Sequence, residues 1–164
     1  MKTIAFFGHK YIFNKNSIKE SLLKTLNSLP FNEYNNFLIG CHGDFDSLAL
    51  STCIYYRNCI NKNVSINVVL TNLSILNKND FNNSKMEFYK QNGCTTMLYD
   101  IEQQHYKNRI TYTNKKMVDN SDLIICYVDM KSYKSGAKTA INYAKKQNKQ
   151  IINLFKEKAR NNKI

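Results

Sequence analysis

The 164-residue chain contains no CxxC cysteine pair. Its cysteines are odd in number and scattered, which argues against a disulfide framework and against a zinc site. Neither His42 nor His105 has a partner at metal-ligand spacing, so no metal is expected. The cysteines are therefore expected to be free thiols, most of them buried. They are Cys41, Cys53, Cys59, Cys94 and Cys126.

The sequence also lacks an apolar run of the roughly 20 residues that a membrane-spanning helix requires. The first ten residues, MKTIAFFGHK, become polar too soon for a signal peptide. No internal repeat, linker or low-complexity boundary divides the chain, and its length is typical of one domain. These absences predict a soluble cytoplasmic protein with a single domain over residues 1–157 and a basic tail over residues 158–164.

Arginine is scarce in a chain that is otherwise strongly basic. The formal net charge is +12, yet only Arg57, Arg109 and Arg160 among the 24 basic residues are arginine. The lysines are spread through every segment, without a zinc finger or the aromatic motif of an RNA-recognition domain. Nucleic acid is therefore a less favoured partner, although lysines bind phosphates. A small molecule that carries phosphate is compatible with the same charge.

Short apolar runs alternate with stretches that repeat apolar residues at helical spacing. Strands are predicted near residues 3–7, 36–40, 64–70, 95–99, 122–128 and 150–155. Helices are predicted from Ile18 to Leu29, over 45–57, over 81–92, over about 113–120 and around Ala137 to Ala144. The alternation implies right-handed crossovers. It predicts an α/β fold of the Rossmann-like, three-layer α/β/α kind, with a mostly parallel sheet of about six strands.

Three polar loops follow predicted strands, at residues 8–10, 40–47 and 129–139. The carboxyl ends of parallel strands meet at one edge of a sheet, where ligands commonly bind. We therefore expect these loops to form one binding rim. The candidate ligand-binding residues in them are Gly8, His9, Lys10, Gly40, Gly43, Asp44, Asp46, Tyr133, Ser135, Gly136, Lys138 and Thr139.

The second loop, GCHGDFDS, supports two interpretations. Gly40 and Gly43 let the backbone turn tightly and approach a ligand, while the following helix offers its N–H groups and positive dipole end to an anion. Alternatively, the loop is an ordinary turn in which Asp44 caps the helix and Asp46 stabilises its first turn. If the protein is an enzyme, Asp44 or Asp46 is the candidate catalytic base.

The third loop contains the sequence KSGAKT at the start of a predicted helix. Gly136 permits close approach, Ser135 can cap the helix, and a phosphate fits such a helix start well. The pattern is not a Walker A motif, because Met130 and Lys131 stand where its first glycine is required. Tyr133 lies inside this loop and is the tyrosine best placed to stack on a base.

The same stretches, in this order, resemble the SLOG superfamily, the Rossmann-like group that includes Lonely Guy (LOG) proteins and the DNA-processing protein DprA. Within it they resemble the small YpsA/YspA-like branch. IAFFGHK is similar to that branch's strand ending in Gly-His-Arg, and IGCHGDFDSLAL to its glycine-rich turn. NKKMVDNSDLIICYV and SGAKTAINYAKKQNKQIINL resemble its Asn-x-x-Met-Val-Asp approach and its Ser-Gly-Thr helix. The resemblance covers nearly the whole chain.

The resemblance implies a domain that binds a nucleotide-derived ligand at the three loops, with Asn114 as a further contact residue. It also implies a homodimer or larger assembly. The chain departs from the branch where Lys10 replaces an arginine, where Thr113 stands in place of a frequent arginine, and where Ala137 replaces a threonine. The glutamate of the LOG motif is not matched, and Asn142 stands in that region of the helix.

The sequence therefore supports three functions. The first is binding of a nucleotide or nucleotide-derived small molecule, as a sensor or sequestering module that requires no other cofactor. The second is hydrolysis of a nucleotide N-glycosidic bond, as in LOG enzymes, with Asp44 or Asp46 supplying the carboxylate in place of the missing glutamate. The third is DprA-like binding of nucleic acid. Whether the protein is an enzyme stays open at this point.

Overall fold

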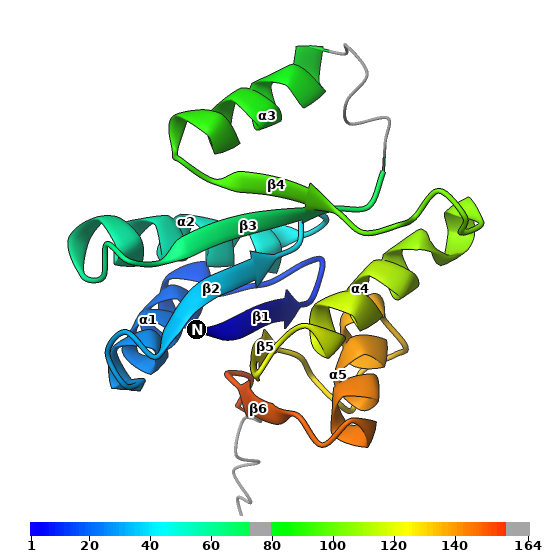
Figure 1. The fold of residues 1–164 in the computed structure, drawn as a ribbon. Helices are drawn as coiled ribbons and strands as arrows, with labels where there is room; N and C mark the ends of the chain where they lie inside the picture. Colours follow the sequence, from blue (N-terminus) through cyan, green and yellow to red (C-terminus); the bar gives the residue numbers. More distant parts are fainter. Residues whose placement is uncertain (73–79, 157–164) are drawn as a thin grey trace, which may run out of the picture.

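The computed structural model describes residues 1–72 and 80–156, which form a six-stranded sheet covered by helices (Figure 1). The strands are β1 (Lys2–Gly8), β2 (Tyr34–Ile39), β3 (Ser65–Leu70), β4 (Thr95–Leu98), β5 (Leu123–Tyr127) and β6 (Gln150–Asn153). They lie in the order β4-β3-β2-β1-β5-β6, and every pairing between neighbours is parallel. The predicted Rossmann-like α/β fold is confirmed, with a sheet that is wholly rather than mostly parallel.

Helices cover both faces of this sheet and make three layers (Figure 1). They are α1 (Lys15–Ser28), α2 (Asp44–Cys59), α3 (Asp80–Gln91), α4 (Arg109–Asp119) and α5 (Gly136–Lys146). The buried side chains of α1 and α2 belong to one apolar cluster with one face of the sheet, and Tyr89 of α3 joins them. The buried side chains of α4 and α5 form a second cluster with the opposite face.

Strand β1 contributes to both apolar clusters because it is buried on both faces. Ile4 and Phe6 pack into the cluster with α1 and α2, whereas Ala5 and Phe7 pack into the cluster with α4 and α5. Alternate residues of a strand point to opposite faces, so a strand with helices on both sides is apolar along its whole length. The run TIAFF therefore specifies a central strand, which carries Gly8 to the carboxyl edge of the sheet.

Helix α4 begins at Arg109, earlier than the predicted start near residue 113. A 3₁₀ turn at Tyr106–Asn108 (η2) leads directly into it. The first turn of α4 offers little apolar pattern, because Ile110 is its only aliphatic residue and is 45% exposed. The helical period becomes visible only where Thr113 and Met117 turn toward the sheet.

Strand β6 ends at Asn153, two residues before the predicted end at residue 155. The Asn153 side chain accepts the N–H of Val128 at 3.1 Å and donates to the carbonyl of Val128 at 2.8 Å. This pair of bonds uses the backbone groups of Val128 that would otherwise continue the strand pairing, so the ladder stops there.

Two further predictions concern the C-terminal tail and the absence of a membrane-spanning helix. The predicted basic tail, residues 158–164, lies outside the described residues. Within the part of the chain that the structure describes, no helix is both long enough and apolar enough to cross a membrane.

Candidate ligand-binding pocket

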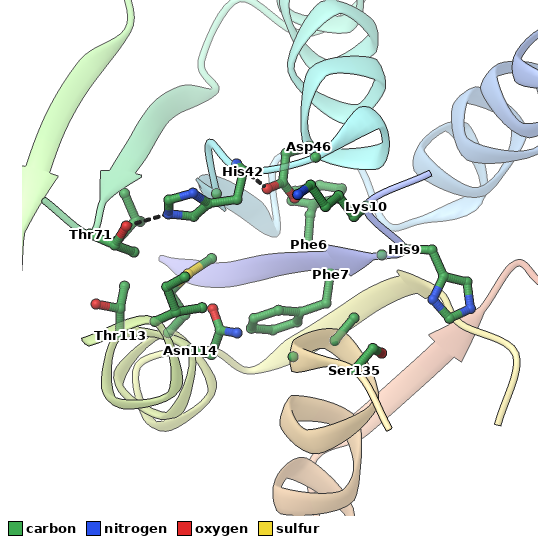
Figure 2. A pocket seen from close by; sticks show the side chains of 18 residues that line it. Phe6, Phe7, His9, Lys10, His42, Asp46, Thr71, Thr113, Asn114 and Ser135 are labelled. Atoms are coloured by element: carbon green, nitrogen blue, oxygen red, sulfur yellow. Dashed lines mark hydrogen bonds between the residues drawn. The ribbon is translucent and has the colours of Figure 1, made fainter. Parts of the chain in front are cut away.

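The strand order reverses at β1: β2, β3 and β4 lie on one side of it, and β5 and β6 on the other. At such a point the loops from neighbouring strands leave in opposite directions and open a crevice at the carboxyl edge. A cavity of about 210 Å³ lies there. Its walls are the ends of β1, β2 and β3, the N-termini of α2 and α5, and one face of α4 (Figure 2).

Two glycines bring the N-terminus of α2 close to β1. A Cβ atom on Gly8 would lie 2.1 Å from Cγ of the fully buried Phe45, and one on Gly43 would lie 2.7 Å from the backbone Cα of Lys10. The N–H of Asp44 also donates to the carbonyl of Lys10 at 2.8 Å. Any larger residue at positions 8 or 43 would push the two loops apart, so these glycines are needed to close the pocket.

Asp46 lies in the first turn of α2 and lines the pocket. Its Oδ2 atom accepts the N–H of His42 at 2.8 Å and lies 2.8 Å from the position that a Cβ atom on Gly40 would occupy. Burial raises the pKa of Asp46 to about 6, against the opposing effect of backbone hydrogen bonds from His42 and Gly43. A carboxyl group with this pKa can gain or lose a proton near neutral pH, as general acids and bases do.

His42 lines the pocket between Asp46 and Thr71, and Figure 2 shows its ring directed at Thr71. The ring Nε2 is hydrogen-bonded to the Thr71 hydroxyl. Burial lowers the pKa of His42, and the positive charges of Lys85 and Lys10 lower it further. His42 is therefore expected to be neutral at pH 7. Its hydrogen bond to Thr71 connects the loop after β2 to the end of β3.

His9 connects the first loop to the third. Its Nε2 accepts the N–H of Asp129 at 2.8 Å, and the ring points away from the centre of the pocket (Figure 2). Burial lowers the pKa of His9, and the nearby charge of Asp129 opposes that effect only in part. A neutral ring is the form that can accept this bond, so His9 holds the two loops together.

The N-terminus of α5 opens onto the pocket at Ser135, Gly136 and Ala137. The Ser135 hydroxyl accepts the N–H of Lys138 at 3.1 Å and so caps the helix. A Cβ atom on Gly136 would meet only Asn114 Nδ2, at 3.8 Å, so the backbone at this helix start is open to a ligand. Backbone N–H groups in the first turn of a helix attract anions.

Helix α4 forms the wall opposite α2. Ile110, Thr113, Asn114 and Met117 line the pocket from this side, and Figure 2 shows Thr113 and Asn114 across β1 from His42 and Asp46. Met117 packs into the same apolar cluster as Phe7 and Val69, which also line the pocket. This side of the pocket is thus mainly apolar, with two polar side chains set into it.

Most residues that the sequence singled out come together in this pocket. Those that line it are Gly8, His9, Lys10, Gly40, Gly43, Asp46, Asn114, Ser135 and Gly136. Their roles toward a ligand stay predictions.

The other four candidate residues lie elsewhere. Asp44 faces the start of α1 and the loop before it: its Oδ2 lies 3.5 Å from Nζ of Lys15, the first residue of α1, and accepts the N–H of Ile12 in the loop at 3.4 Å. Tyr133 is 96% exposed and does not line the pocket. Lys138 and Thr139 line a separate surface hollow. Asp46 is therefore the better placed of the two candidate catalytic carboxylates.

Several pocket residues were not predicted by the sequence. Thr71 follows directly after the apolar run of β3, which was a detectable signal, because residues at the carboxyl end of a parallel strand lie at the binding edge. Ile110, Thr113 and Met117 share a face of α4 at spacings of three and four residues. Ile110 was missed because the helix was expected to begin near residue 113, whereas Thr113 and Met117 lay inside the expected helix but were not assigned to the pocket.

Over residues 1–72 and 80–156, the structure contains no group of three or more His, Cys, Asp or Glu side chains that could hold a metal ion. No protein-family model matches the chain, and a search of curated proteins finds no significant match. The function must therefore be argued from the pocket itself.

Proposed function

We propose that the protein binds a small nucleotide-derived molecule in the pocket at the carboxyl edge of its sheet, as a sensor or sequestering module. The observation that carries this proposal is the pairing of two helix N-termini with an apolar wall around one cavity. The helix ends suit a phosphate group, and the apolar wall suits the faces of a base. A nucleotide combines these two chemical groups in one molecule.

The polar side of the pocket supports a phosphate-bearing ligand. The N-termini of α2 and α5 present first-turn residues to it, and the capping hydroxyl of Ser135 stands at the same rim. Lys10 adds a positive charge, and Figure 2 shows its side chain directed back over the pocket near Asp46. Positive helix ends together with a lysine favour an anion such as a phosphate monoester.

The size of the cavity favours a small ligand. Ligand pockets commonly have volumes of about 300–1,000 Å³, whereas this cavity measures about 210 Å³. A nucleoside monophosphate therefore fits better than a dinucleotide. The motif resemblance to the SLOG superfamily, and within it the YpsA/YspA-like branch, points to the same class of ligand.

Native mass spectrometry of freshly purified protein tests the proposal first. A bound mass that is released on denaturation and identified as a nucleotide derivative, near one per chain, is the expected result. The same spectrum reports whether the protein forms the predicted homodimer or larger assembly. If the protein is empty, calorimetric titration with nucleoside monophosphates, ribose 5-phosphate, NAD and ADP-ribose follows. No heat with any of these compounds would overturn the proposal.

Hydrolysis of the N-glycosidic bond is the second candidate function. The position and the raised pKa of Asp46 favour it. Its carboxyl group has a pKa raised to about 6 and lines the pocket. Such a group can activate water or stabilise a cationic sugar. Incubation with the same monophosphates should then release free base, and Asp46→Asn should abolish the release while leaving the nucleotide bound. Intact nucleotides after long incubation with the wild-type protein would exclude this function.

A further inference from the structure

The hydroxyl of Thr113 has an unusual environment. Thr113 is 1% exposed, and its Oγ1 atom is buried without a hydrogen-bond partner. The only other buried side-chain atom of this kind among the described residues is Asn35 Oδ1, at the amino end of β2 and outside the pocket. Buried polar groups in native proteins are nearly always hydrogen-bonded, so an exception calls for a missing partner.

Three other helical threonines show how such a hydroxyl is normally satisfied. Each donates to the carbonyl four residues earlier, which is the usual solution for threonine in a helix. The donors and distances are Thr25 to Ser21 at 2.9 Å, Thr52 to Leu48 at 2.7 Å, and Thr139 to Ser135 at 3.0 Å. Thr113 makes no such bond to its own helix, although it lies inside α4.

Thr113 belongs to the apolar wall of the pocket, and its hydroxyl oxygen lies just behind the surface of that wall. Ile110 and Met117 stand one helical turn before and after Thr113, and all three line the cavity. The next residue, Asn114, also lines the cavity, and its side chain makes no hydrogen bond to any described residue. One carboxamide at an otherwise apolar surface, and one hydroxyl just behind that surface, thus lack hydrogen-bond partners among the described residues.

We infer that Thr113 determines specificity: on binding, its side chain turns to the other χ1 rotamer of a helical threonine, so that the hydroxyl reaches the cavity and hydrogen-bonds the polar edge of the ligand's base, with Asn114 beside it. This inference rests on the proposed function. A base has apolar faces and a polar edge, which matches apolar side chains around two hydrogen-bonding groups. A site built to hydrogen-bond a ligand rejects analogues that leave its buried polar groups unpaired, so the identity of the base is read here. The phosphate lies at the opposite end, against the N-termini of α2 and α5.

Calorimetric titration of purified variants with AMP, GMP, CMP, UMP and ribose 5-phosphate tests the inference. Thr113→Val removes the hydroxyl and keeps the shape of the side chain. It should weaken binding of the preferred monophosphate at least about tenfold. It should also reduce the differences in affinity among the four monophosphates. Binding of ribose 5-phosphate should not change, because that probe has no base. Thr113→Ser, which keeps the hydroxyl, should bind within about threefold of the wild type.

Thr52→Val is the matched control, because Thr52 is a fully buried helical threonine outside the pocket whose hydroxyl is already bonded. It should bind every probe as the wild type does but melt at a lower temperature, since it loses an internal hydrogen bond. Thr113→Val should melt at the wild-type temperature or higher in the absence of ligand, because it removes an unsatisfied group.

The possible outcomes distinguish failure of this inference from failure of the proposed function. If monophosphates bind the wild type and Thr113→Val binds them equally well, the inference fails and the proposed function stands. If Thr113→Val melts as low as Thr52→Val does, the hydroxyl has a structural role and the inference also fails. If neither the monophosphates nor ribose 5-phosphate bind the wild type, the proposed function fails and takes the inference with it.

Discussion

At the scale of single residues, Gly8 is the glycine with the least space for a side chain. A Cβ atom there would lie within 2.5 Å of three atoms of Phe45, which is fully buried and cannot turn aside into solvent. Gly8→Ala should therefore lower the free energy of unfolding by roughly 2–3 kcal/mol through overpacking. Urea denaturation followed by far-UV circular dichroism measures this loss.

Gly136→Ala is the matched control for that prediction. Its Cβ atom would meet only Asn114 Nδ2, at the ordinary contact distance of 3.8 Å, and the position begins a helix. Stability should be unchanged or slightly higher, because alanine restricts the unfolded chain more than glycine does. Equal losses of stability in the two variants would contradict the packing explanation.

Asp46 should make stability depend on pH. Because the pKa of Asp46 is raised to about 6 in the folded state, while an unfolded aspartate titrates near about 3.9, the folded protein holds a proton that the unfolded chain has released. The contribution of Asp46 is thus fully present below about pH 4 and is lost as the pH rises through about 6. Asp46→Asn should match the wild type at pH 4 and exceed it at pH 8 by about 1–2 kcal/mol.

Paired urea titrations of wild type and Asp46→Asn across this range give the measurement. A stability difference that stays constant from pH 4 to pH 8 would mean that the carboxyl group titrates normally. In that case Asp46 would also lose its standing as a candidate general base.

Residue types in the loops predicted the location of the pocket better than they predicted which side chains face it. Gly8, Gly43 and Asp46 line the pocket, as the loop pattern suggested, because their backbone positions are determined by the strand ends. Asp44 turns toward Lys15 and Tyr133 points into solvent. The direction of a side chain depends on neighbours that are distant in sequence, and a loop motif alone does not contain that information.

At the scale of the elements, two substitutions of Ser135 at the N-terminus of α5 should affect stability and ligand binding differently. Ser135 caps this helix by accepting the N–H of Lys138 at 3.1 Å. Ser135→Ala should cost about 1 kcal/mol of stability, because that N–H loses its partner. Ser135→Asp should keep the stability of the wild type, since aspartate is an equally good cap and its charge suits a helix N-terminus.

Binding should follow a different order in these two variants. The negative charge of Ser135→Asp lies where the proposed phosphate approaches, so affinity for a nucleoside monophosphate should fall about tenfold or more. Thermal melting and calorimetric titration measure the two effects separately. If Ser135→Asp binds the monophosphate as well as the wild type does, the phosphate does not lie at α5.

Helix α4 shows why one element of the site was misjudged. Its buried residues are Thr113, Met117 and Val118, none of them in its first turn, so no buried apolar residue marks where the helix begins. The turn before it is initiated locally, where the His105 ring Nδ1 accepts the N–H of Lys107 at 3.4 Å. In contrast, strands such as β1 and β5 are apolar throughout, and their ends were predicted to within one or two residues.

At the scale of the whole molecule, the reactivity of two buried cysteines can show whether the helical layers on the two faces of the sheet open together. Cys53 belongs to the cluster with α1 and α2, and Cys126 to the cluster with α4 and α5. Both are fully buried, and burial raises the pKa of Cys126 to about 12. Only the thiolate reacts with alkylating agents, so neither should react in the native state, whereas the exposed Cys59 should react at once.

Alkylation with iodoacetamide, followed by peptide mass spectrometry, tests this prediction. Because both layers share one sheet, they should open together, and Cys53 and Cys126 should be labelled at equal rates set by global unfolding. Much faster labelling of Cys126 would instead show that the layer with α4 and α5 opens independently. The pocket wall would then be the less stable half of the molecule.

Sheet order is the whole-molecule feature that the sequence did not predict. Alternating strands and helices indicated a parallel sheet, but the same alternation is compatible with several orders. The reversal at β1, which creates the crevice, is visible only in the pairing of Ile4 with both Phe37 and Leu123. Such pairings join residues far apart in sequence, and no local pattern encodes them.

The position of β1 has a consequence for how the protein is made. Ile4 is synthesised before its neighbour Leu123 in β5, which is added almost 120 residues later. At roughly 5–20 residues per second, one edge of β1 stays unpaired for about 6–24 seconds in the nascent chain. Until β5 has been synthesised, the nascent chain therefore exposes one edge of a largely apolar strand, and chaperones that hold emerging chains can bind residues 3–7 during that time.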